Sequence, residues 1–177
     1  ATQGYANYLK AHFAAPSVAI AYDSRINSRL FAETAAGVFA ANGIRVHIYP
    51  RLMPTPSLSF AVRDLRSCGG VVITASHNPA KYNGYKVYGA DGCQITTEAA
   101  AAIQQEIDRI DPFADVYTLD FAEGLASGII AYIGEDTVER YLAAVSTASL
   151  LPESFSRSAS IVYTPLNGTG ISCVPRC

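Results

Sequence analysis

The densest group of chemically active side chains lies in residues 74–79, Thr-Ala-Ser-His-Asn-Pro, directly after the apolar residues 71–73. The hydroxyl of Ser76 is a candidate nucleophile or phosphate carrier, but a free serine is a poor nucleophile and needs a base or an electrophilic partner. Adjacent residues in an extended segment point in opposite directions, so His77 is not the obvious base. The partner of Ser76 is therefore expected elsewhere in the chain.

Three other readings of this segment compete with a phosphate-carrying serine. A serine-hydrolase triad would need His12 or His47 to approach Ser76, and the chain has no G-x-S-x-G motif. A nucleotide site would need a G-x-G-x-x-G motif or a P-loop after a strand, and neither is present. A plain turn-rich connection is the third, because Asn78-Pro79 and Asn83-Gly84 are turn signals. On the residues alone, the plain connection is favoured over a catalytic role.

The elements that must position Ser76 can be read from periodicity. Strands are predicted over Val18–Tyr22, Ile44–Tyr49 and Val71–Thr74. A helix capped by Asn27 or Ser28 follows the first strand, and a helix capped by Thr55 and running to Arg66 follows the second. This alternation is typical of βαβ units and a largely parallel sheet. Ligands of such sheets meet the loops at the carboxyl ends of the strands, here residues 23–28, 49–56 and 75–83.

The rest of the chain predicts an end to this domain and the start of another. A strand over Gly84–Tyr88, a helix capped by Thr96 or Thr97 and a helix over Glu135–Val145 complete the first unit. Residues 152–160 are polar and serine-rich, which is typical of a linker. Residues 161–163, Ile-Val-Tyr, then start a new strand, and a glycine-containing loop over residues 165–170 follows it. We therefore expect a first domain over residues 1–151 and a truncated second domain over 152–177.

Composition excludes several classes of function. The net charge is −2 and the basic residues are scattered, which argues against nucleic acid as the partner. No run of about 18 apolar residues predicts a transmembrane helix, and no signal peptide precedes the domain, so we expect a cytoplasmic protein. The four cysteines form neither a zinc pattern nor a disulfide framework. Only 16% of residues are charged, against roughly 25% in an ordinary domain, which suggests surface buried against further protein.

Several motifs taken together favour a catalytic role for the segment around Ser76 over a plain connection. The segment Thr-Ala-Ser-His-Asn-Pro, followed by Tyr-Asn-Gly-Tyr-Lys at 82–86, closely resembles the active-site serine loop of the α-D-phosphohexomutases, the phosphoglucomutase/phosphomannomutase family. Residues 22–25, 54–56, 60–63 and 91–92 extend the resemblance, which is strong from about Val18 to Gln94. It implies a three-layer αβα domain with a mainly parallel mixed sheet, plus the first strand of a second, similar domain.

The resemblance also implies a mechanism. Ser76 would be a phosphoserine that gives its phosphoryl group to a sugar phosphate, so that a bisphosphorylated sugar such as glucose 1,6-bisphosphate forms and then returns the other phosphoryl group. Lys86 matches the family lysine proposed as general acid/base, and His77 the histidine beside the phosphoserine. Arg25 would lie beside Ser76, where its forked guanidinium suits phosphate. Asn78 would hold the loop through side-chain to backbone bonds and lie at the phosphate site.

One departure from the family concerns the metal. The family binds Mg²⁺ through the phosphoserine and three aspartates of an Asp-Gly-Asp-x-Asp loop, and this chain has no such loop. Only Ser76, through its phosphate, would then contact the metal within this chain. We expect the aspartates and the sugar-selecting domains to lie beyond Cys177, and an N-terminal strand with an active-site arginine to precede Ala1. The fragment alone would be inactive, and the alternative is a non-catalytic sugar-phosphate-binding module that retains the loop.

Overall fold

The computed structural model describes residues 1–151 and 158–177, and its centre is a five-stranded sheet in the order β4-β3-β1-β2-β5. The strands are β1 (Ser17–Tyr22), β2 (Arg45–Ile48), β3 (Gly69–Ile73), β4 (Tyr85–Gly89) and β5 (Ile130–Tyr132). All neighbours pair in parallel except β3 and β4, which pair antiparallel. The sheet is therefore mixed and mainly parallel, which confirms the predicted fold class.

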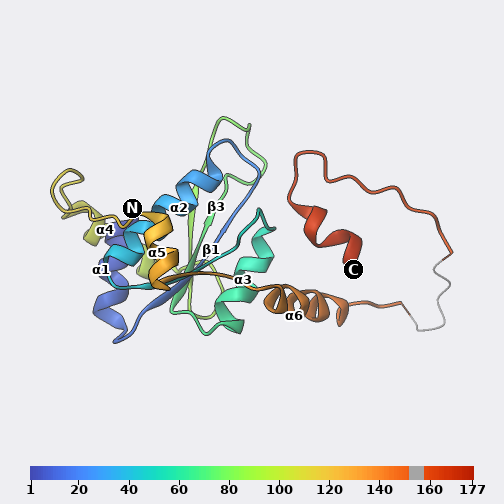
Figure 1. Ribbon diagram of the computed structural model, residues 1–177, viewed down its shortest axis with the longest axis horizontal. Coiled ribbons are helices and arrows are strands. Elements are labelled where there is room, and N and C mark those ends of the chain that lie inside the picture. The colour runs from blue at the N-terminus through green and yellow to red at the C-terminus, as the bar shows by residue number, and fades with distance from the viewer. Residues whose placement is uncertain (152–157) are drawn as a thin grey trace.

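Helices cover both faces of the sheet and form the outer two of three layers (Figure 1). The first face is covered by α1 (Thr2–His12), α2 (Ser28–Ala41), α4 (Thr97–Asp108) and α5 (Phe121–Ser127). The second face is covered by α3 (Thr55–Asp64) and α6 (Glu135–Ser146). Two short 3-10 turns, Gly170–Ser172 and Val174–Arg176, end the chain.

Strand alternation divides the buried core into two halves. Val18, Ile20 and Val71 point to the first face and pack with Phe39 of α2 and Leu9 of α1. The intervening residues Ala19, Ala21 and Val72 point to the second face and pack with Leu58 and Val62 of α3 and Leu142 of α6. Because β1 and β3 are buried on both faces, they read in the sequence as unbroken apolar runs rather than as alternating ones.

The predicted start of α3 was wrong by one residue, and that of α2 was right in position but lacks a side-chain cap bond. Helix α3 is preceded by Pro54 rather than capped by Thr55, and it ends at Asp64 rather than Arg66. The Ser57 hydroxyl turns back to the carbonyl of Pro54 at 2.7 Å, so no side chain caps the first turn. Asn27 does precede α2, but it has a left-handed φ of 62° and makes no side-chain cap bond. The Ser28 hydroxyl donates instead to Asp23, which belongs to the candidate site. The cap of α4 by Thr96 is confirmed.

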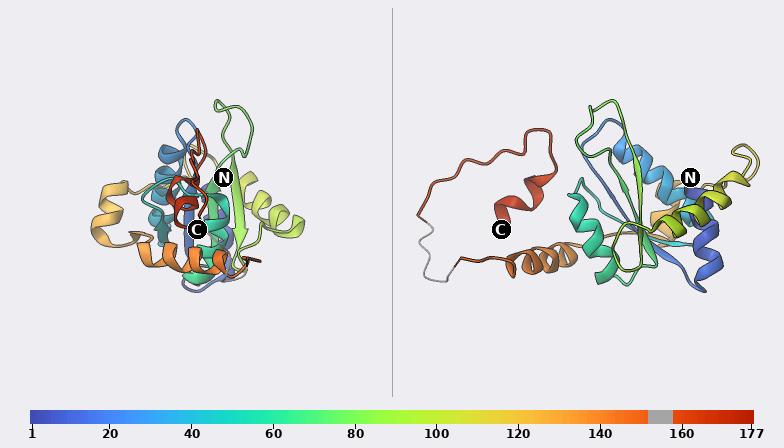
Figure 2. Two further views of the ribbon diagram at one scale, coloured as in Figure 1. Left: turned by 90° about the vertical axis from the view of Figure 1, so that its right-hand side faces the viewer. Right: turned by 180° about the vertical axis from the view of Figure 1, so that it is seen from behind.

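The segment after α6 differs from its prediction in one respect. Residues 152–157 of the predicted linker lie outside the described residues. Residues 161–163 are exposed and are not in a strand, and no strand of the described chain lies beside them to supply hydrogen bonds. In Figure 1 and in the right-hand view of Figure 2, the segment from residue 158 runs back toward the start of α3. There Arg176 pairs with Glu135 and Glu139, while Cys173 is buried against the second half of the core. The division into two domains stays a prediction.

No helix within residues 1–151 and 158–177 has both the length and the apolar character to cross a membrane.

Candidate active site

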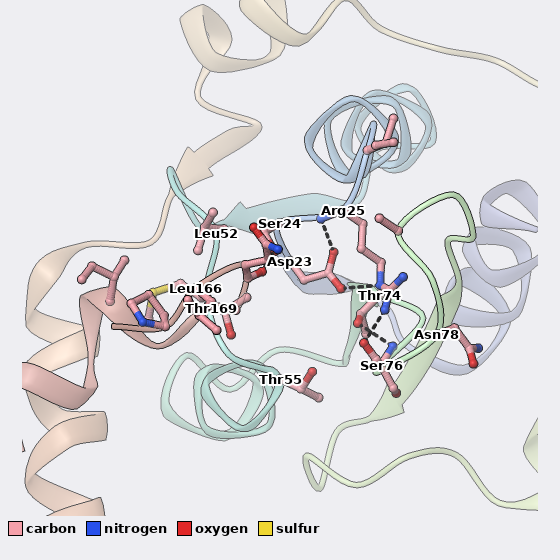
Figure 3. Close-up of a pocket in the computed structure, with 17 residues that line it drawn as sticks. Asp23, Ser24, Arg25, Leu52, Thr55, Thr74, Ser76, Asn78, Leu166 and Thr169 are labelled. Atoms are coloured by element: carbon pink, nitrogen blue, oxygen red, sulfur yellow. Dashed lines mark hydrogen bonds and ion pairs between the residues drawn. The ribbon is translucent and has the colours of Figure 1, made fainter. Parts of the chain in front are cut away.

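The loops that follow β1, β2 and β3 meet at one edge of the sheet, as the parallel order requires. They line a pocket of about 860 Å³, which is in the range that takes a small-molecule ligand. Asp23 and Arg25 line it from the first loop, Leu52 and Thr55 from the second, and Ser76 from the third (Figure 3). The sequence-based prediction that these loops converge agrees with this arrangement.

Ser76 and Lys86 are in direct contact. The Nζ atom of Lys86 donates a hydrogen bond of 2.7 Å to Oγ of Ser76. Lys86 lies on β4 opposite Val72 of β3, so the antiparallel return of the chain brings it back beside the end of β3. This pairing explains how two residues ten positions apart meet at one point. It also supplies the cationic partner that the Ser76 hydroxyl needs.

Ser76 has an unusual backbone conformation. Its φ is 57°, in the left-handed region that non-glycine residues rarely adopt. Its N–H donates to Oγ1 of Thr74 at 3.0 Å, and its side chain is exposed to the pocket. Such conformations persist where the surrounding structure holds them, and they cluster at functional sites. The loop therefore presents the Ser76 hydroxyl to the pocket, within reach of Lys86.

Arg25, in the loop that follows β1, binds residues 75–83, which we call the serine loop. Its guanidinium donates to the carbonyls of Pro79 at 2.9 Å, Tyr82 at 3.2 Å and Ser76, and its Nε donates to Asp23 at 3.1 Å. The Arg25 side chain is only 9% exposed. An arginine has five N–H donors, so these bonds leave one N–H on Nη2 directed to no partner in the described chain. Arg25 thus lies beside Ser76 as predicted, and most of its donors hold the loop.

Asp23 and Asn83 form a second connection between the same loops, which sequence reasoning missed. Asp23 accepts from the Ser28 hydroxyl at 2.7 Å, and that hydroxyl accepts from Nδ2 of Asn83 at 2.9 Å. Asn83 also donates to the carbonyl of Ile26 at 3.3 Å. The signal in the sequence was an aspartate two residues before Arg25, placed where its carboxylate can orient the guanidinium. Asn83, and not Asn78, holds the loop through side-chain bonds.

Gly84 closes the serine loop at a point where no side chain fits. Thr74 N–H donates to the Gly84 carbonyl at 3.0 Å, and a Cβ on Gly84 would lie 2.6 Å from the carbonyl oxygen of Thr74. Because that oxygen belongs to the backbone, the strand end itself would have to move. Glycine is therefore required here by close approach of two backbones.

We expect Gly84→Ala to destabilise the fold by roughly 1–3 kcal/mol, the usual cost of overpacking, and to lower activity by displacing Ser76 from Lys86. Urea unfolding and turnover of the full-length protein would measure the two effects. Gly43→Ala is the matched control. A Cβ at residue 43 meets nothing within 4 Å, but the backbone there has a left-handed φ of 74°, which strains any residue other than glycine. It should cost about 1–2 kcal/mol of stability and no activity. Equal activities of the two variants would contradict the role of Gly84.

Of the three histidines, only His77 lies near Ser76 in the chain, and Asn78 follows it. His77 is exposed beside Ser76, and no contact between their side chains is present in the described structure. Asn78 lines the pocket, and its backbone N–H donates to Ala75 at 3.1 Å while its side chain makes no bond to the described chain. His12 bonds the carbonyl of Tyr8 on α1, and His47 is half-buried on β2. The catalytic and binding roles of His77 and Asn78 stay predictions, and neither His12 nor His47 lines the pocket.

Residues 165–169 form the opposite wall of the pocket, which was not predicted (Figure 3). The Ser24 hydroxyl donates to the carbonyl of Asn167, and Leu166 and Thr169 line the pocket. The glycine-containing loop that the sequence assigns to a second domain thus contacts the first strand-end loop.

The residues present do not fit a complete Mg²⁺ site. Within the described chain, no group of three or more histidine, cysteine, aspartate or glutamate side chains is placed to hold a metal ion. Asp23, the carboxylate in the pocket nearest in sequence to Arg25, is already bonded to Arg25 and Ser28.

Comparisons with known proteins agree with this geometry. Residues 1–114 match the family described as phosphoglucomutase/phosphomannomutase, alpha/beta/alpha domain I. The chain therefore belongs to the phosphoglucomutase/phosphomannomutase family, and the matched part is the first domain of that family.

Particular relatives are bacterial phosphoglucomutases. The chain is 37% identical over 175 residues to the phosphoglucomutase of Staphylococcus epidermidis, with 97% of this chain and 31% of the relative covered. For Staphylococcus aureus the identity is 35%, with 97% and 30% covered. The chain thus spans about a third of the length of the curated relatives it matches.

Solved structures show the same fold. A putative phosphomannomutase from Thermus thermophilus superposes with a TM-score of 0.69 at 31% identity, over 82% of this chain and 30% of that one. The phosphoglucomutase parafusin from Paramecium superposes with a TM-score of 0.64 at 19% identity, over 81% of this chain and 30% of that one, which is a likeness of fold.

Proposed function

We propose that this chain is the phosphoserine-bearing domain of a longer enzyme that interconverts sugar 1-phosphates and sugar 6-phosphates. The observation that carries this proposal is the 2.7 Å contact between Lys86 and Ser76 in a pocket of about 860 Å³. A serine in direct contact with a lysine, at the end of a buried strand, suits a group that accepts and returns a phosphoryl group. The family and the names of its relatives support the same chemistry.

The reaction consists of two phosphoryl transfers of opposite direction. In the first, a sugar hydroxyl attacks the phosphorus on Ser76, the bond from phosphorus to Oγ breaks, and a bond to the sugar oxygen forms. The neutral amine of Lys86 takes the proton of the attacking hydroxyl, and the ammonium so formed gives it to Oγ of Ser76, which is the leaving group. The resulting bisphosphorylated sugar turns in the pocket and gives its other phosphoryl group to Ser76. The resting phosphoserine is thereby restored.

Positively charged and polar groups around Ser76 serve the transferred phosphoryl group. The ammonium that forms on Lys86 when it takes the proton offsets charge that develops on the phosphoryl oxygens. Arg25 offers its one remaining N–H and holds the loop, while His77 and Asn78 lie next in the chain to orient the phosphate. The preferred substrate is glucose 1-phosphate, because the relatives are named phosphoglucomutases, and glucose 1,6-bisphosphate is the corresponding intermediate and activator.

The same proposal assigns the metal and the other partners outside this chain. Mg²⁺ would contact the phosphate on Ser76, with its aspartate ligands supplied by a further domain of the same protein. The sugar-selecting surfaces would come from further domains as well, since the relatives are about three times longer.

We expect the isolated chain of 177 residues to show no mutase activity, while the full-length protein converts at least one sugar 1-phosphate. The physical reason is that transfer needs both the phosphoserine and the groups that hold the sugar and the metal. A panel of glucose, mannose, glucosamine and pentose 1-phosphates, with 1,6-bisphosphate added as activator, measures this and identifies the substrate. Efficient conversion of glucose 1-phosphate by the isolated chain would contradict the expectation.

A non-catalytic module that binds sugar phosphate is the second candidate. The observation that favours it is the lack of a metal-ligand cluster in the described residues. Such a module would bind a sugar phosphate at full length yet convert none of the panel. Intact mass after incubation with glucose 1,6-bisphosphate separates the two, because only the enzyme should gain a phosphoryl group on Ser76.

A further inference from the structure

A second hollow, of about 560 Å³, lies at the opposite edge of the sheet from Ser76. Strands β1 and β2 begin there, and helices α2, α3 and α5 end there, so the lining includes Pro16, Gly43, Leu65 and Gly128. The proposed mutase chemistry uses only the carboxyl ends of the strands. This hollow is therefore separate from the candidate active site, and its side chains need their own explanation.

The charged and titratable side chains of the hollow are all basic. Arg45 and His47 are two positions apart on β2, so both point to the face of the sheet that α3 covers. Their partners on β1 are the small residues Ser17 and Ala19, which leave space above the sheet. Arg66 enters from the turn after α3. No carboxylate lines the hollow.

The two arginines are exceptional within the described chain. Arg25, Arg29, Arg51, Arg109, Arg140 and Arg176 each pair with a carboxylate. Arg63 donates to the carbonyl of Ser59. Only the side chains of Arg45 and Arg66, among the arginines that the structure describes, have neither a carboxylate nor a hydrogen-bond partner, and both line this hollow. Their charges are available to a ligand.

Capping of helix ends does not account for these arginines. A cation near a helix C terminus offsets the partial negative charge of its free carbonyls. Here the carbonyl of Phe39 at the end of α2 accepts from the backbone of Ile44 at 3.0 Å. At the end of α3, the carbonyl of Val62 accepts from Ser67 at 2.8 Å. Neither guanidinium donates to a helix-end carbonyl.

The backbone at Arg66 is a further unusual feature. Its φ is 51°, and it follows the last residue of the α3 turn, where glycine or asparagine is usual. An arginine in this left-handed position is locally unfavourable. This backbone conformation lies at the turn after α3 whose residues Leu65 and Arg66 line the hollow.

We propose that this hollow is a second anion site that takes a small phosphorylated molecule, held by the guanidinium groups of Arg45 and Arg66 with His47 as a further donor. The forked guanidinium matches phosphate oxygens bidentately, and two such groups balance a phosphate dianion. The volume lies in the range of pockets that hold small ligands. Binding involves no covalent step and does not depend on the proposed mutase activity.

His47 provides a local reporter for this site. Burial and then the charge of Arg45 hold the pKa of His47 below its usual value. The charged groups that line the hollow with it are Arg45 and Arg66. A bound phosphate dianion favours the protonated imidazole, so it should raise the pKa of His47. The chain has three histidines, and the other two, His12 and His77, do not line this hollow.

The test is a pH titration of the histidine ring signals by NMR in the full chain, with inorganic phosphate varied against sodium chloride at constant ionic strength. We expect the pKa of His47 to rise saturably with phosphate, while the ring signals of His12 show no dependence on phosphate. Arg45→Gln and Arg66→Asn should each weaken the phosphate dependence about tenfold, the cost of losing one charge-assisted contact. Asparagine is chosen at residue 66 because it tolerates the left-handed conformation.

Arg109→Gln is the matched control, because it removes an exposed arginine of α4 that pairs with Glu106 outside the hollow. Its phosphate dependence should equal that of the unchanged chain. A pKa of His47 that ignores phosphate in the unchanged chain would overturn the proposal without any variant. A phosphate response confined to His77, or one that is as strong in Arg45→Gln and Arg66→Asn as in the unchanged chain, would overturn it as well.

Discussion

Ser76→Ala is expected to abolish both turnover of sugar 1-phosphate and phosphoryl uptake by the full-length protein. The substitution removes the oxygen that accepts the bond of 2.7 Å from Lys86 and that would carry the phosphoryl group. No other hydroxyl in the described structure contacts Lys86, so no substitute acceptor is in place. A coupled assay of sugar 6-phosphate formation measures turnover. Intact mass after incubation with glucose 1,6-bisphosphate measures phosphoryl uptake.

Backbone strain must be separated from chemistry in this experiment. Ser76 has a φ of 57°, and alanine in that conformation costs about 1–2 kcal/mol that glycine does not. Ser76→Gly is therefore the second variant, since it removes the hydroxyl and relieves the strain. Both variants should be inactive, and Ser76→Gly should be more stable than Ser76→Ala by about 1–2 kcal/mol. A near-normal rate in either would show that the phosphoryl carrier is another residue.

The sequence predicted the part of this site that depends on strand order. Because Val18–Tyr22 and Val71–Thr74 are apolar runs with helices between them, their carboxyl ends were expected at one edge of a parallel sheet, and β1 and β3 do pair in parallel. The position of Arg25 beside Ser76 was implied by the resemblance. The pairing of Ser76 with Lys86 came from the resemblance alone. Its physical cause, the antiparallel return of β4, depends on a loop conformation that periodicity does not encode.

Other features were missed because their signals are short or non-local. Helix α5 and strand β5 occupy only Phe121–Ser127 and Ile130–Tyr132, below the length at which periodicity is informative. The cap at Asp120 and the glycine at 128 were the available signals for α5. Asn83 resembled a turn residue, and its bond to Ser28 joins positions far apart in the chain. The hollow of Arg45 and Arg66 could not be found from sequence, since it depends on which arginines lack carboxylate partners.

Lys86→Met is expected to lower kcat of the full-length protein by roughly 10²–10⁴-fold, the usual contribution of a positioned general acid/base. Methionine keeps the length of the side chain and its packing on β4, but it neither donates to Ser76 nor moves a proton. Lys86→Arg keeps the positive charge, yet arginine cannot lose its proton near neutral pH. If Lys86 acts by proton transfer, the arginine variant should also be slow while its KM for sugar phosphate stays close to normal. If the charge alone mattered, the arginine variant would recover most of the rate.

Lys81→Met is the matched control for this experiment. Lys81 belongs to the same loop, but its Nζ lies 5.1 Å from the centre of the Tyr82 ring and makes no bond to Ser76. Removing this charge changes the net charge of the loop by the same amount as Lys86→Met. We therefore expect Lys81→Met to keep a near-normal kcat. A loss as large as that of Lys86→Met would mean that the loop needs general positive charge, and the assignment of acid/base chemistry to Lys86 would be wrong.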